Sequence, residues 1–294
     1  MEIIRSIEAF KSFRTGWPSS NTADLCFVPT MGALHSGHLS LVEEARKFSQ
    51  YVVVSIFVNP TQFGQGEDYE EYPRQMKKDI DQLKNLGVGA VFIPCDNQMY
   101  PLGYRTNVLV EKWERRLCGH SRPNHFRGVT TVVLKLFNIV RPTVAFFGQK
   151  DAQQAILINR MTEDLNLDVE ILVCPIIREK DGLAISSRNR YLSAQERQAA
   201  VVLFRTLNWA IQQVDRGERK VKVLVNEMKK KIKAEPLAHL DYVSIVDPND
   251  LKPILRLNRT ALLALAVFIG KTRLIDNTIL LPEKSSSVSK ESVL

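Results

Sequence analysis

Two histidines spaced three residues apart, His35 and His38, are the side chains of this sequence best suited to chemistry. They lie in the run PTMGALHSGH together with Gly32 and Gly37. An imidazole can donate a hydrogen bond to an oxygen that gains charge during phosphoryl chemistry. A glycine lets a ligand approach the backbone closely. A single histidine near a helix start is ordinarily a cap or a surface residue, so it is the grouping that indicates a site.

A strand, a turn and a helix are predicted around these histidines. The apolar run Leu25–Val28 indicates a buried strand, and Pro29 is expected to end it because proline has no N–H to donate. Thr30–Gly32 form the turn, and Ser36 is the expected N-cap of a helix with apolar residues at helical spacing. A helix N-terminus carries unpaired N–H groups and the positive end of its dipole, which suits a polyphosphate.

A second strand, 51–58, is almost wholly apolar and β-branched, as in a parallel sheet covered on both faces. Strand, helix and strand form a βαβ unit, and ligands bind at the carboxyl ends of such strands. Asn59 and Gln62 follow the second strand and suit a substrate with hydroxyl and carboxylate groups. The alternative is an ordinary Asn-Pro turn beside a solvated glutamine.

Two later segments carry groups that could hold phosphate. Gly148–Asp151 follows the predicted strand 143–147, where Lys150 can neutralise a phosphate and Asp151 stands at a helix start. Ser186–Arg188 combine two hydroxyls with a guanidinium, although a serine-rich helix cap before a basic surface would look the same. Asp79 and Asp81, on the predicted helix 75–85, could reach Mg²⁺, but their pattern favours a solvated helix face.

Composition is that of an ordinary globular protein. The chain has 294 residues, 45% of them hydrophobic, and a net charge of +8 that favours anionic ligands without indicating nucleic acid. The four cysteines form no CxxC pair, and Cys26 and Cys174 lie in strand-like runs, so we expect a reduced, cytoplasmic protein. The charged first residues indicate no signal peptide, and the apolar run 261–270 is about half the ~20 residues of a membrane span.

The predicted fold class is α/β, a Rossmann-like parallel sheet followed by a smaller α+β domain. We expect a nucleotide-binding domain over 1–176, a C-terminal lid domain over 177–282 and a disordered tail over 283–294. Further predicted strands are 88–93, 106–110, 168–174, 239–246, 260–269 and 272–275, and further helices are 129–140, 152–165, 193–214 and 221–233.

The HxGH pattern resembles the signature of the nucleotidylyltransferase superfamily. The fuller set of PTMGALHSGH, FVNPTQF, RPNHF, GQKD and ISSR, in this order, resembles the pantoate–beta-alanine ligase family over residues 1 to about 281. Three positions depart from that family pattern: Asn124 stands for Gly, Gln149 for Glu and Ile185 for Met. Asparagine tolerates a left-handed conformation, so the turn at Asn124 is expected to persist.

The resemblance implies a two-step ligation in which ATP and (R)-pantoate give pantoyl adenylate and pyrophosphate, and beta-alanine then displaces AMP. It implies ATP as a substrate, Mg²⁺ held through the ATP phosphates rather than by an assigned residue, and a homodimer that binds neither membrane nor nucleic acid. The implied catalytic residues are His35, His38, Lys150 and Arg188. The implied ATP-binding residues are Met31, Gly32, Ala33, Leu34, His35, Ser36, Gly37, His38, Gly148, Gln149, Lys150, Asp151, Ile177, Ile185, Ser186, Ser187 and Arg188. Pantoate is assigned to Pro29, Met31, Asn59, Gln62 and Gln154, and beta-alanine to Gln62.

Two other functions fit parts of the sequence. Another nucleotidylyltransferase would join a nucleotide to a phosphorylated acceptor, although the amide-rich FVNPTQF argues for an acid with an uncharged alcohol. A nucleic-acid-binding protein would use the lysine run at 229–233, for which a solvated helix face is the simpler interpretation. No Ser-His-Asp order, nucleophile elbow or cysteine motif indicates a covalent enzyme intermediate.

Overall fold

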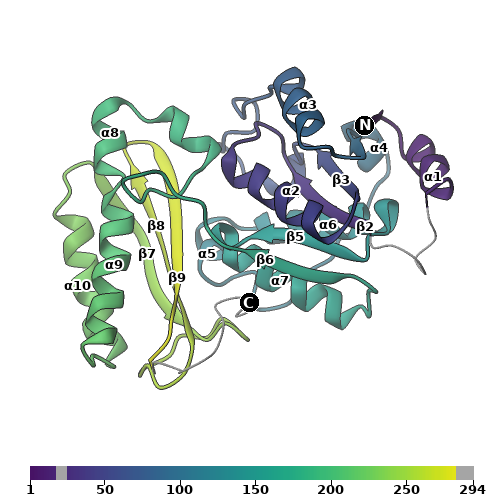
Figure 1. The fold of residues 1–294 in the computed structure, drawn as a ribbon. Coiled ribbons are helices and arrows are strands. Elements are labelled where there is room, and N and C mark those ends of the chain that lie inside the picture. Colours follow the sequence, from purple (N-terminus) through teal and green to yellow (C-terminus); the bar gives the residue numbers. More distant parts are fainter. Residues whose placement is uncertain (18–24, 283–294) are drawn as a thin grey trace. The chain divides into compact units, whose positions relative to one another are not determined.

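The computed structural model describes residues 1–17 and 25–282, so the predicted tail lies outside the described residues. The chain forms two compact units (Figure 1). Of the described residues, the first unit contains 1–17, 25–115, 122–148 and 157–174, and the second contains 116–121, 149–156 and 175–282.

The first unit is built on a six-stranded parallel sheet. Its strands are β1 (Glu2–Ile4), β2 (Leu25–Thr30), β3 (Tyr51–Ile56), β4 (Ala90–Phe92), β5 (Val144–Gly148) and β6 (Glu170–Cys174), and their order is β1-β4-β3-β2-β5-β6. The apolar runs predicted these strands because a parallel strand is buried on both faces. The Rossmann-like sheet expected from the sequence is therefore confirmed.

Helices cover both faces of this sheet. On one face, α2 (Ser36–Phe48) and α3 (Met76–Asn85) bury Leu41, Val42 and Leu83 against the strands. On the other, α1 (Ile7–Thr15) packs Phe10 against Phe92, and α6 (His125–Val140) packs Phe137 against Phe27. Shorter elements are η1 (Pro60–Gln62) and α4 (Asp96–Met99), and α7 (Ala152–Asp164) has residues in both units.

Pro29 does not end its strand, contrary to the prediction. β2 continues to Thr30, with Pro29 opposite Ser55 of β3. The carbonyl of Thr30 accepts from Phe57 N, so Thr30 faces β3 and Pro29 faces the other neighbour. On that side β5 pairs only with Cys26 and Phe27. The ladder there has already ended, and no partner requires a donor from Pro29.

The second unit is the smaller α+β body that the sequence predicted. Its antiparallel sheet has the order β7 (Ala238–Val246), β8 (Ala261–Ile269), β9 (Thr272–Leu280). Helices α9 (Val202–Asp215) and α10 (Val221–Lys233) pack Leu203, Leu224 and Met228 into the same core as this sheet. The remaining elements are α5 (Cys118–Ser121), η2 (Gln149–Asp151), η3 (Ser187–Tyr191) and α8 (Ala194–Ala199).

Two predicted elements are wrong. Residues 106–110 form no strand, because Val108 bonds the hydroxyls of Thr130 and Thr131 on α6 instead of another strand. The helix predicted over 193–214 is broken into α8 and α9, where Val201 N bonds Gln198 O and Leu203 N bonds Ala200 O. These i→i+3 bonds tighten the backbone and interrupt the α-helical ladder.

Two expectations about apolar segments are tested directly. Residues 261–269 form β8, buried along almost its whole length, as predicted for this apolar run. Among residues 1–17 and 25–282, none of the helices is both long and apolar enough to cross a membrane. Cys26 and Cys174 are both buried, as expected of core residues, and burial raises the pKa of Cys174 to about 11.

Candidate functional site

The two histidines meet at the start of α2. Their rings are stacked, with centroids 4.0 Å apart and planes inclined by 25°. His35, rather than the predicted Ser36, is the N-cap residue: its backbone is extended, and its carbonyl accepts from His38 N at 2.8 Å and Leu39 N at 3.0 Å. A β-carbon on Gly37 would lie 3.1 Å from the His35 ring, so glycine makes room for the imidazole.

The turn before the histidines is held by side chains that reach it from neighbouring strands and helices. Gly32 has φ +78° and Ala33 has φ +50°. Thr30 Oγ1 accepts from Gly32 N and donates to Ser55 O of β3. A β-carbon on Gly32 would lie 2.9 Å from Ile56 Cγ2, so the lack of space and the left-handed backbone both favour glycine here.

Asp79 of α3 is the second support of this turn, and the expectation of a solvated position is wrong for it. The side chain is 1% exposed. Its two carboxylate oxygens accept from Ala33 N and Leu34 N, each at 2.9 Å. These N–H groups are therefore engaged by Asp79. Asp81, two residues later on the same helix, is exposed, as expected.

The histidine turn lies where the strand order of the sheet reverses. From β2 the chain runs outward through β3 and β4, whereas β5 and β6 lie on the other side of β2. The pairing of Phe27 with Ala145 sets Thr30, the end of β2, level with Gly148, the end of β5. In open α/β sheets, ligands bind at the carboxyl ends of strands at such a reversal.

The predicted amide pair lies beside this turn. Asn59 is 1% and Gln62 9% exposed, so neither is the solvated residue of an ordinary turn. Asn59 Nδ2 donates to Gln62 Oε1 at 3.1 Å, and Gln62 Nε2 contacts Met31 Sδ at 2.8 Å. Tyr100, whose pKa burial raises to about 12, donates its hydroxyl to Asn59 Oδ1 at 2.7 Å. The strand ends after β2 and β3 are thus joined through side chains.

A network of hydrogen bonds among polar side chains, which the sequence did not predict, supports the backbone of Gln62. Arg122 donates to both carboxylate oxygens of Glu67, at 2.7 and 2.6 Å. His125 Nδ1 donates to Gln62 O at 2.7 Å, which leaves Nε2 to accept from Arg122 Nη1 at 3.0 Å. Burial alone raises the pKa of Glu67, but the hydrogen bond and charge of Arg122 outweigh it and lower that pKa below its usual value. The sequence signal for this network was the basic residues Arg122 and His125 in the RPNHF motif.

Two backbone features of α6 complete this region. Asn124, which stands where the family pattern has glycine, adopts φ +68°, as expected for a residue that tolerates the left-handed region. Gly128 packs directly on η1: a β-carbon there would overlap the carbonyl of Thr61 and lie 2.7 Å from Gln62 N. Asn59 Nδ2 also donates to Gly128 O at 3.2 Å, so α6 and the Gln62 segment are in direct contact.

Lys150 and Gln149 belong to the second unit, on η2. Asn277 Nδ2 donates to Gln149 O at 2.8 Å and Lys150 O at 3.0 Å. The Lys150 ammonium is 3.6 Å from Asp151, and its side chain is 21% exposed. Gln149, in place of the family's glutamate, donates to Asn277 Oδ1 at 3.4 Å. The Gln149 side-chain amide thus contacts Asn277 within the second unit.

The serine–arginine segment lies in the same unit after a short hairpin. Ile185 N bonds Ile177 O at 3.0 Å, and Arg178 pairs with Ala184. Ser186 is the N-cap of η3, and its hydroxyl accepts from Arg188 N at 3.3 Å. Ser186 therefore caps a short 3₁₀ helix. This agrees with the helix-cap alternative given for this segment, and a role in phosphate binding stays a prediction.

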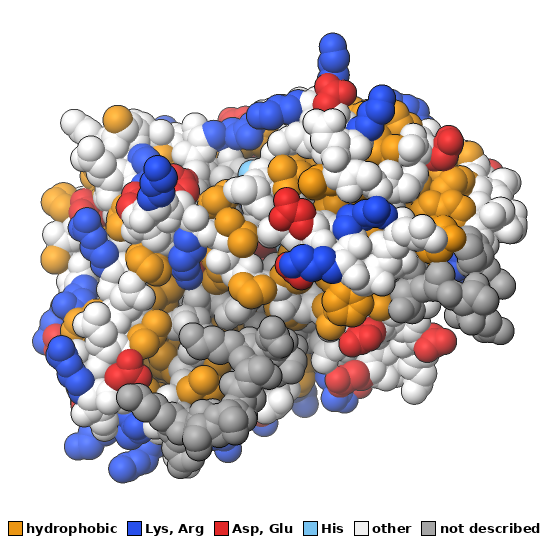
Figure 2. All heavy atoms as spheres, viewed as in Figure 1, with side chains coloured by type: hydrophobic (Ala, Val, Ile, Leu, Met, Phe, Trp, Pro, Cys, Tyr) orange, Lys and Arg blue, Asp and Glu red, His pale blue; other side chains and the backbone are white. Residues whose placement is uncertain are grey.

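The first unit thus brings together the predicted residues Pro29, Met31, His35, His38, Asn59 and Gln62, and the second carries Gln149, Lys150, Gln154 and Ser186–Arg188. That the two groups share one site stays a prediction. The lysines of this run are exposed on α10, whereas Leu224 and Met228 of the same helix are buried. Figure 2 shows blue Lys and Arg side chains along the side of the second unit where Figure 1 draws α10. Lys230 pairs with Glu227 and Lys231 lies over Trp209, as on an ordinary solvated face.

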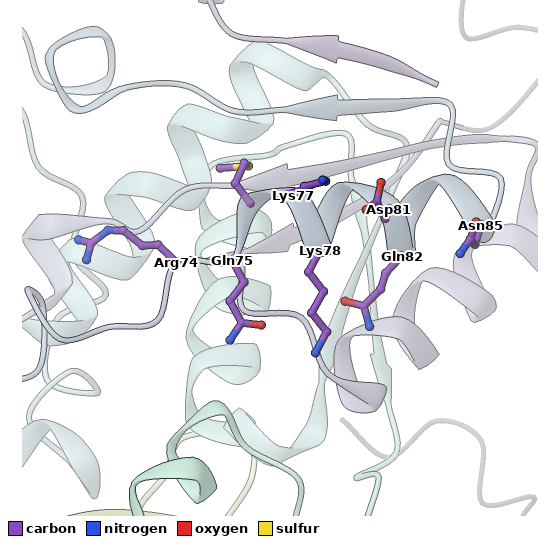
Figure 3. Close-up of a pocket in the computed structure, with 8 residues that line it drawn as sticks. Arg74, Gln75, Lys77, Lys78, Asp81, Gln82 and Asn85 are labelled. Carbon is purple, nitrogen blue, oxygen red and sulfur yellow. The ribbon is translucent and has the colours of Figure 1, made fainter.

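A separate pocket of about 690 Å³ runs along α3 (Figure 3). Gln75, Lys78 and Gln82 point to the same side of the helix in this view. None of the predicted site residues lines the pocket, whose lining consists of Arg74, Gln75, Met76, Lys77, Lys78, Asp81, Gln82 and Asn85. It is distinct from the strand ends that hold the histidines.

Comparison with known proteins agrees with the geometry. Residues 2–279 match the family described as pantoate-beta-alanine ligase. The chain is 51% identical to the pantothenate synthetase of Thermosipho africanus over 95% of its length and all of that protein, and 55% identical to that of Heliobacterium modesticaldum over 94% of its length and 99% of that protein. A crystal structure of the Thermus thermophilus pantothenate synthetase has a TM-score of 0.89 at 41% identity, covering 95% of this chain and 99% of that one. A crystal structure of the Francisella tularensis pantoate-beta-alanine ligase, complexed with beta-gamma ATP and beta-alanine, has a TM-score of 0.77 at 36% identity, covering 98% of this chain and 100% of that one. The chain belongs to the pantoate-beta-alanine ligase family.

Proposed function

We propose that this protein condenses (R)-pantoate with beta-alanine in an ATP-dependent ligation that passes through pantoyl adenylate. The observation that carries the proposal is the strand-order reversal, where a histidine turn after β2 contacts a buried amide pair after β3. The histidine turn suits a nucleoside triphosphate, and the amides suit a small hydroxy acid. The names of the relatives supply the identity of the acid and the amine.

In the first step, a pantoate carboxylate oxygen attacks the α-phosphorus of ATP, and pyrophosphate leaves with the electrons of the broken P–O bond. In the second, the amine of beta-alanine attacks the acyl carbon, loses a proton and displaces AMP. The reaction needs positioning and charge stabilisation more than covalent help from the protein. His35 and His38 would donate to the phosphate oxygens that gain charge, and Lys150 and Arg188 would neutralise the triphosphate.

Asn59, Gln62 and Met31 would bind the hydroxyl and carboxylate groups of pantoate, with Pro29 beside them and Gln154 as a second amide contact. The hydrogen bonds from Tyr100 to Asn59 and from Asn59 to Gln62 fix which way the Gln62 amide faces. Its oxygen accepts from Asn59, so its NH₂ group is directed to Met31 and would be the group that donates to a bound acid. Beta-alanine would enter beside Gln62, next to the activated acyl group.

We expect Mg²⁺ to be bound by the ATP phosphates. Residues 1–17 and 25–282 bring together no group of three His, Cys, Asp or Glu side chains suited to holding a metal ion. The ion would supply charge neutralisation of the leaving pyrophosphate. We further propose that residues 177–282 act as a lid domain, that the protein is a cytoplasmic homodimer, and that it binds no nucleic acid.

The decisive experiment is ATP–pyrophosphate exchange with pantoate present and beta-alanine absent. We expect exchange that depends on pantoate, and losses of about 10² or more in His38→Ala and Lys150→Ala, as when a transition-state donor is removed. Exchange that requires a phosphorylated acceptor instead would favour another nucleotidylyltransferase. Salt-sensitive RNA binding that survives loss of both histidines would favour a nucleic-acid-binding protein.

A further inference from the structure

Two consecutive residues of β9, Asp276 and Asn277, are polar and almost fully buried, at 2% and 3% exposure. Successive side chains of a strand point to opposite faces, so this pair can hold two different segments at once. β9 packs against both η2 and η3. Buried polar side chains in the middle of a strand reduce its apolar contacts, so a specific task for them is expected.

Asn277 holds the lysine-bearing turn by its backbone. Its amide N–H groups donate to the carbonyls of Gln149 and Lys150, at 2.8 and 3.0 Å. Backbone carbonyls of a 3₁₀ turn are fixed in direction, and two successive bonds from one amide set both the position and the tilt of the turn. The direction in which the Lys150 side chain leaves the backbone therefore depends on Asn277.

Asp276 holds the other phosphate-binding segment through Arg178. The carboxylate accepts two hydrogen bonds from the guanidinium, at 2.7 and 2.9 Å. Arg178 also donates to Gly182 O at 2.9 Å, and its guanidinium lies 4.8 Å from the centre of the Phe204 ring. Arg178 thus closes the hairpin that leads into Ser186–Arg188. A bidentate pair restricts both distance and angle.

We propose that Asp276 and Asn277 are positioning residues that set the spacing between Lys150 and Ser186–Arg188, and so shape the site for the ATP phosphates. The proposal rests on the function proposed above, since it assigns nucleotide binding to these two segments. Neither Asp276 nor Asn277 needs to touch the nucleotide. They act by fixing, from one rigid strand, two segments that are far apart in the sequence.

The second unit offers a matched control. Asp241 and Arg273 form another aspartate–arginine pair in the same sheet, at 2.7 Å and with side chains 15% and 16% exposed. Asp241 bonds Ser121 and Arg273, not η2 or the hairpin. Asp276→Asn and Asp241→Asn therefore remove the same kind of ion pair, and both are expected to lower the melting temperature. The proposal predicts that only Asp276→Asn changes nucleotide affinity.

Binding of α,β-methylene-ATP, measured by isothermal titration calorimetry on the full chain, tests this apart from turnover. We expect the dissociation constant to rise about tenfold in Asn277→Ala, since two neutral hydrogen bonds position the turn. Asp276→Asn should raise it by as much or more, and Asp241→Asn should leave it unchanged. Asn277→Ala is the milder change and keeps the test open if Asp276→Asn does not fold.

A double-mutant cycle separates positioning from general stability. If Asn277 acts through Lys150, Asn277→Ala should cost about tenfold in the wild-type background and little more when combined with Lys150→Ala. Independent, multiplying losses would overturn the proposal, as would equal affinities in Asn277→Ala and Asp241→Asn. If the wild type binds the analogue but shows no pantoate-dependent exchange, the proposed function fails while these comparisons still decide the inference. If the wild type does not bind the analogue, both fail.

Discussion

Asp79→Asn is the sharpest structural perturbation of the histidine turn. The aspartate side chain is buried and accepts two backbone hydrogen bonds, one on each oxygen, at 2.9 Å. Asparagine has nearly the same shape but only one oxygen. Its NH₂ group would face either Ala33 N–H or Leu34 N–H, donor against donor, and that N–H would be left buried without a partner.

The magnitude follows from these two bonds. A hydrogen bond to a charged group contributes about 1.5–3 kcal/mol, and an unsatisfied buried N–H costs about 1–3 kcal/mol. The variant loses one hydrogen bond, weakens the other by removing the charge, and leaves one buried N–H without an acceptor. We therefore expect a loss of about 3 kcal/mol in the free energy of unfolding of the first unit. Displacement of the turn also moves the histidines, and a shift of about 1 Å at a reacting group costs on the order of 10²-fold in rate.

Urea unfolding followed by tryptophan fluorescence, together with pantoate-dependent pyrophosphate exchange, measures both effects. Asp81→Asn is the matched control, because it makes the same chemical change on an exposed position of the same helix. Surface changes of this kind lie within about 0.5 kcal/mol of wild type. Equal stability and equal exchange in the two variants would refute the argument that Asp79 holds the turn.

Three further outcomes are expected. Gly128→Ala should lower the affinity for pantoate and the melting temperature, because the new β-carbon overlaps Thr61 O and crowds Gln62 N; an unchanged pantoate KM would contradict that packing. Asn124→Ala should destabilise by about 1 kcal/mol, whereas Asn124→Gly should be neutral or stabilising, since φ is +68° there; thermal melts of the two variants compare them. The Glu67 carboxylate has a lowered pKa in the folded protein, so its stabilisation is present above its ordinary value of 4.5 and is lost as the pH falls through the lowered value. Melting temperatures of Glu67→Gln between pH 7 and 3 should therefore fall less steeply with pH than those of wild type, and parallel curves would contradict this role for the Arg122 pair.

Local sequence patterns predicted most of the fold, because the apolar residues within an element show which of its faces are buried. The continuous apolar runs of β2, β3 and β8 indicated buried strands, and the segment of α6, which is apolar on several faces, indicated a buried helix. The break between α8 and α9 was missed because it arises from two tightened hydrogen bonds in a sequence that favours helix throughout. β2 continues past Pro29 because Pro29 faces β5, whose pairing with β2 has already ended at that point. The local sequence pattern does not show which neighbouring strand a residue faces.

The site residues that the sequence missed are those that act across long stretches of chain. Asp79 bonds residues 46 and 45 positions away, and Asn277 bonds residues 128 and 127 positions away. A signal was nevertheless present for Asp79. It shares a helix face with Met76, Ile80 and Leu83, which all pack against the sheet, so a carboxylate at that spacing had to be buried with partners. In β9, Asp276 likewise lies on the same strand face as the buried Leu274 and Leu280.

The most direct test of the reaction follows one oxygen atom. With pantoate labelled by ¹⁸O in its carboxylate, attack of that oxygen on the α-phosphorus predicts one ¹⁸O atom in the AMP released when beta-alanine is added. Mass spectrometry of the nucleotide product would read this directly. Unlabelled AMP, or ADP together with ¹⁸O-labelled inorganic phosphate, would contradict an acyl adenylate and the assignment of the histidine turn to its formation.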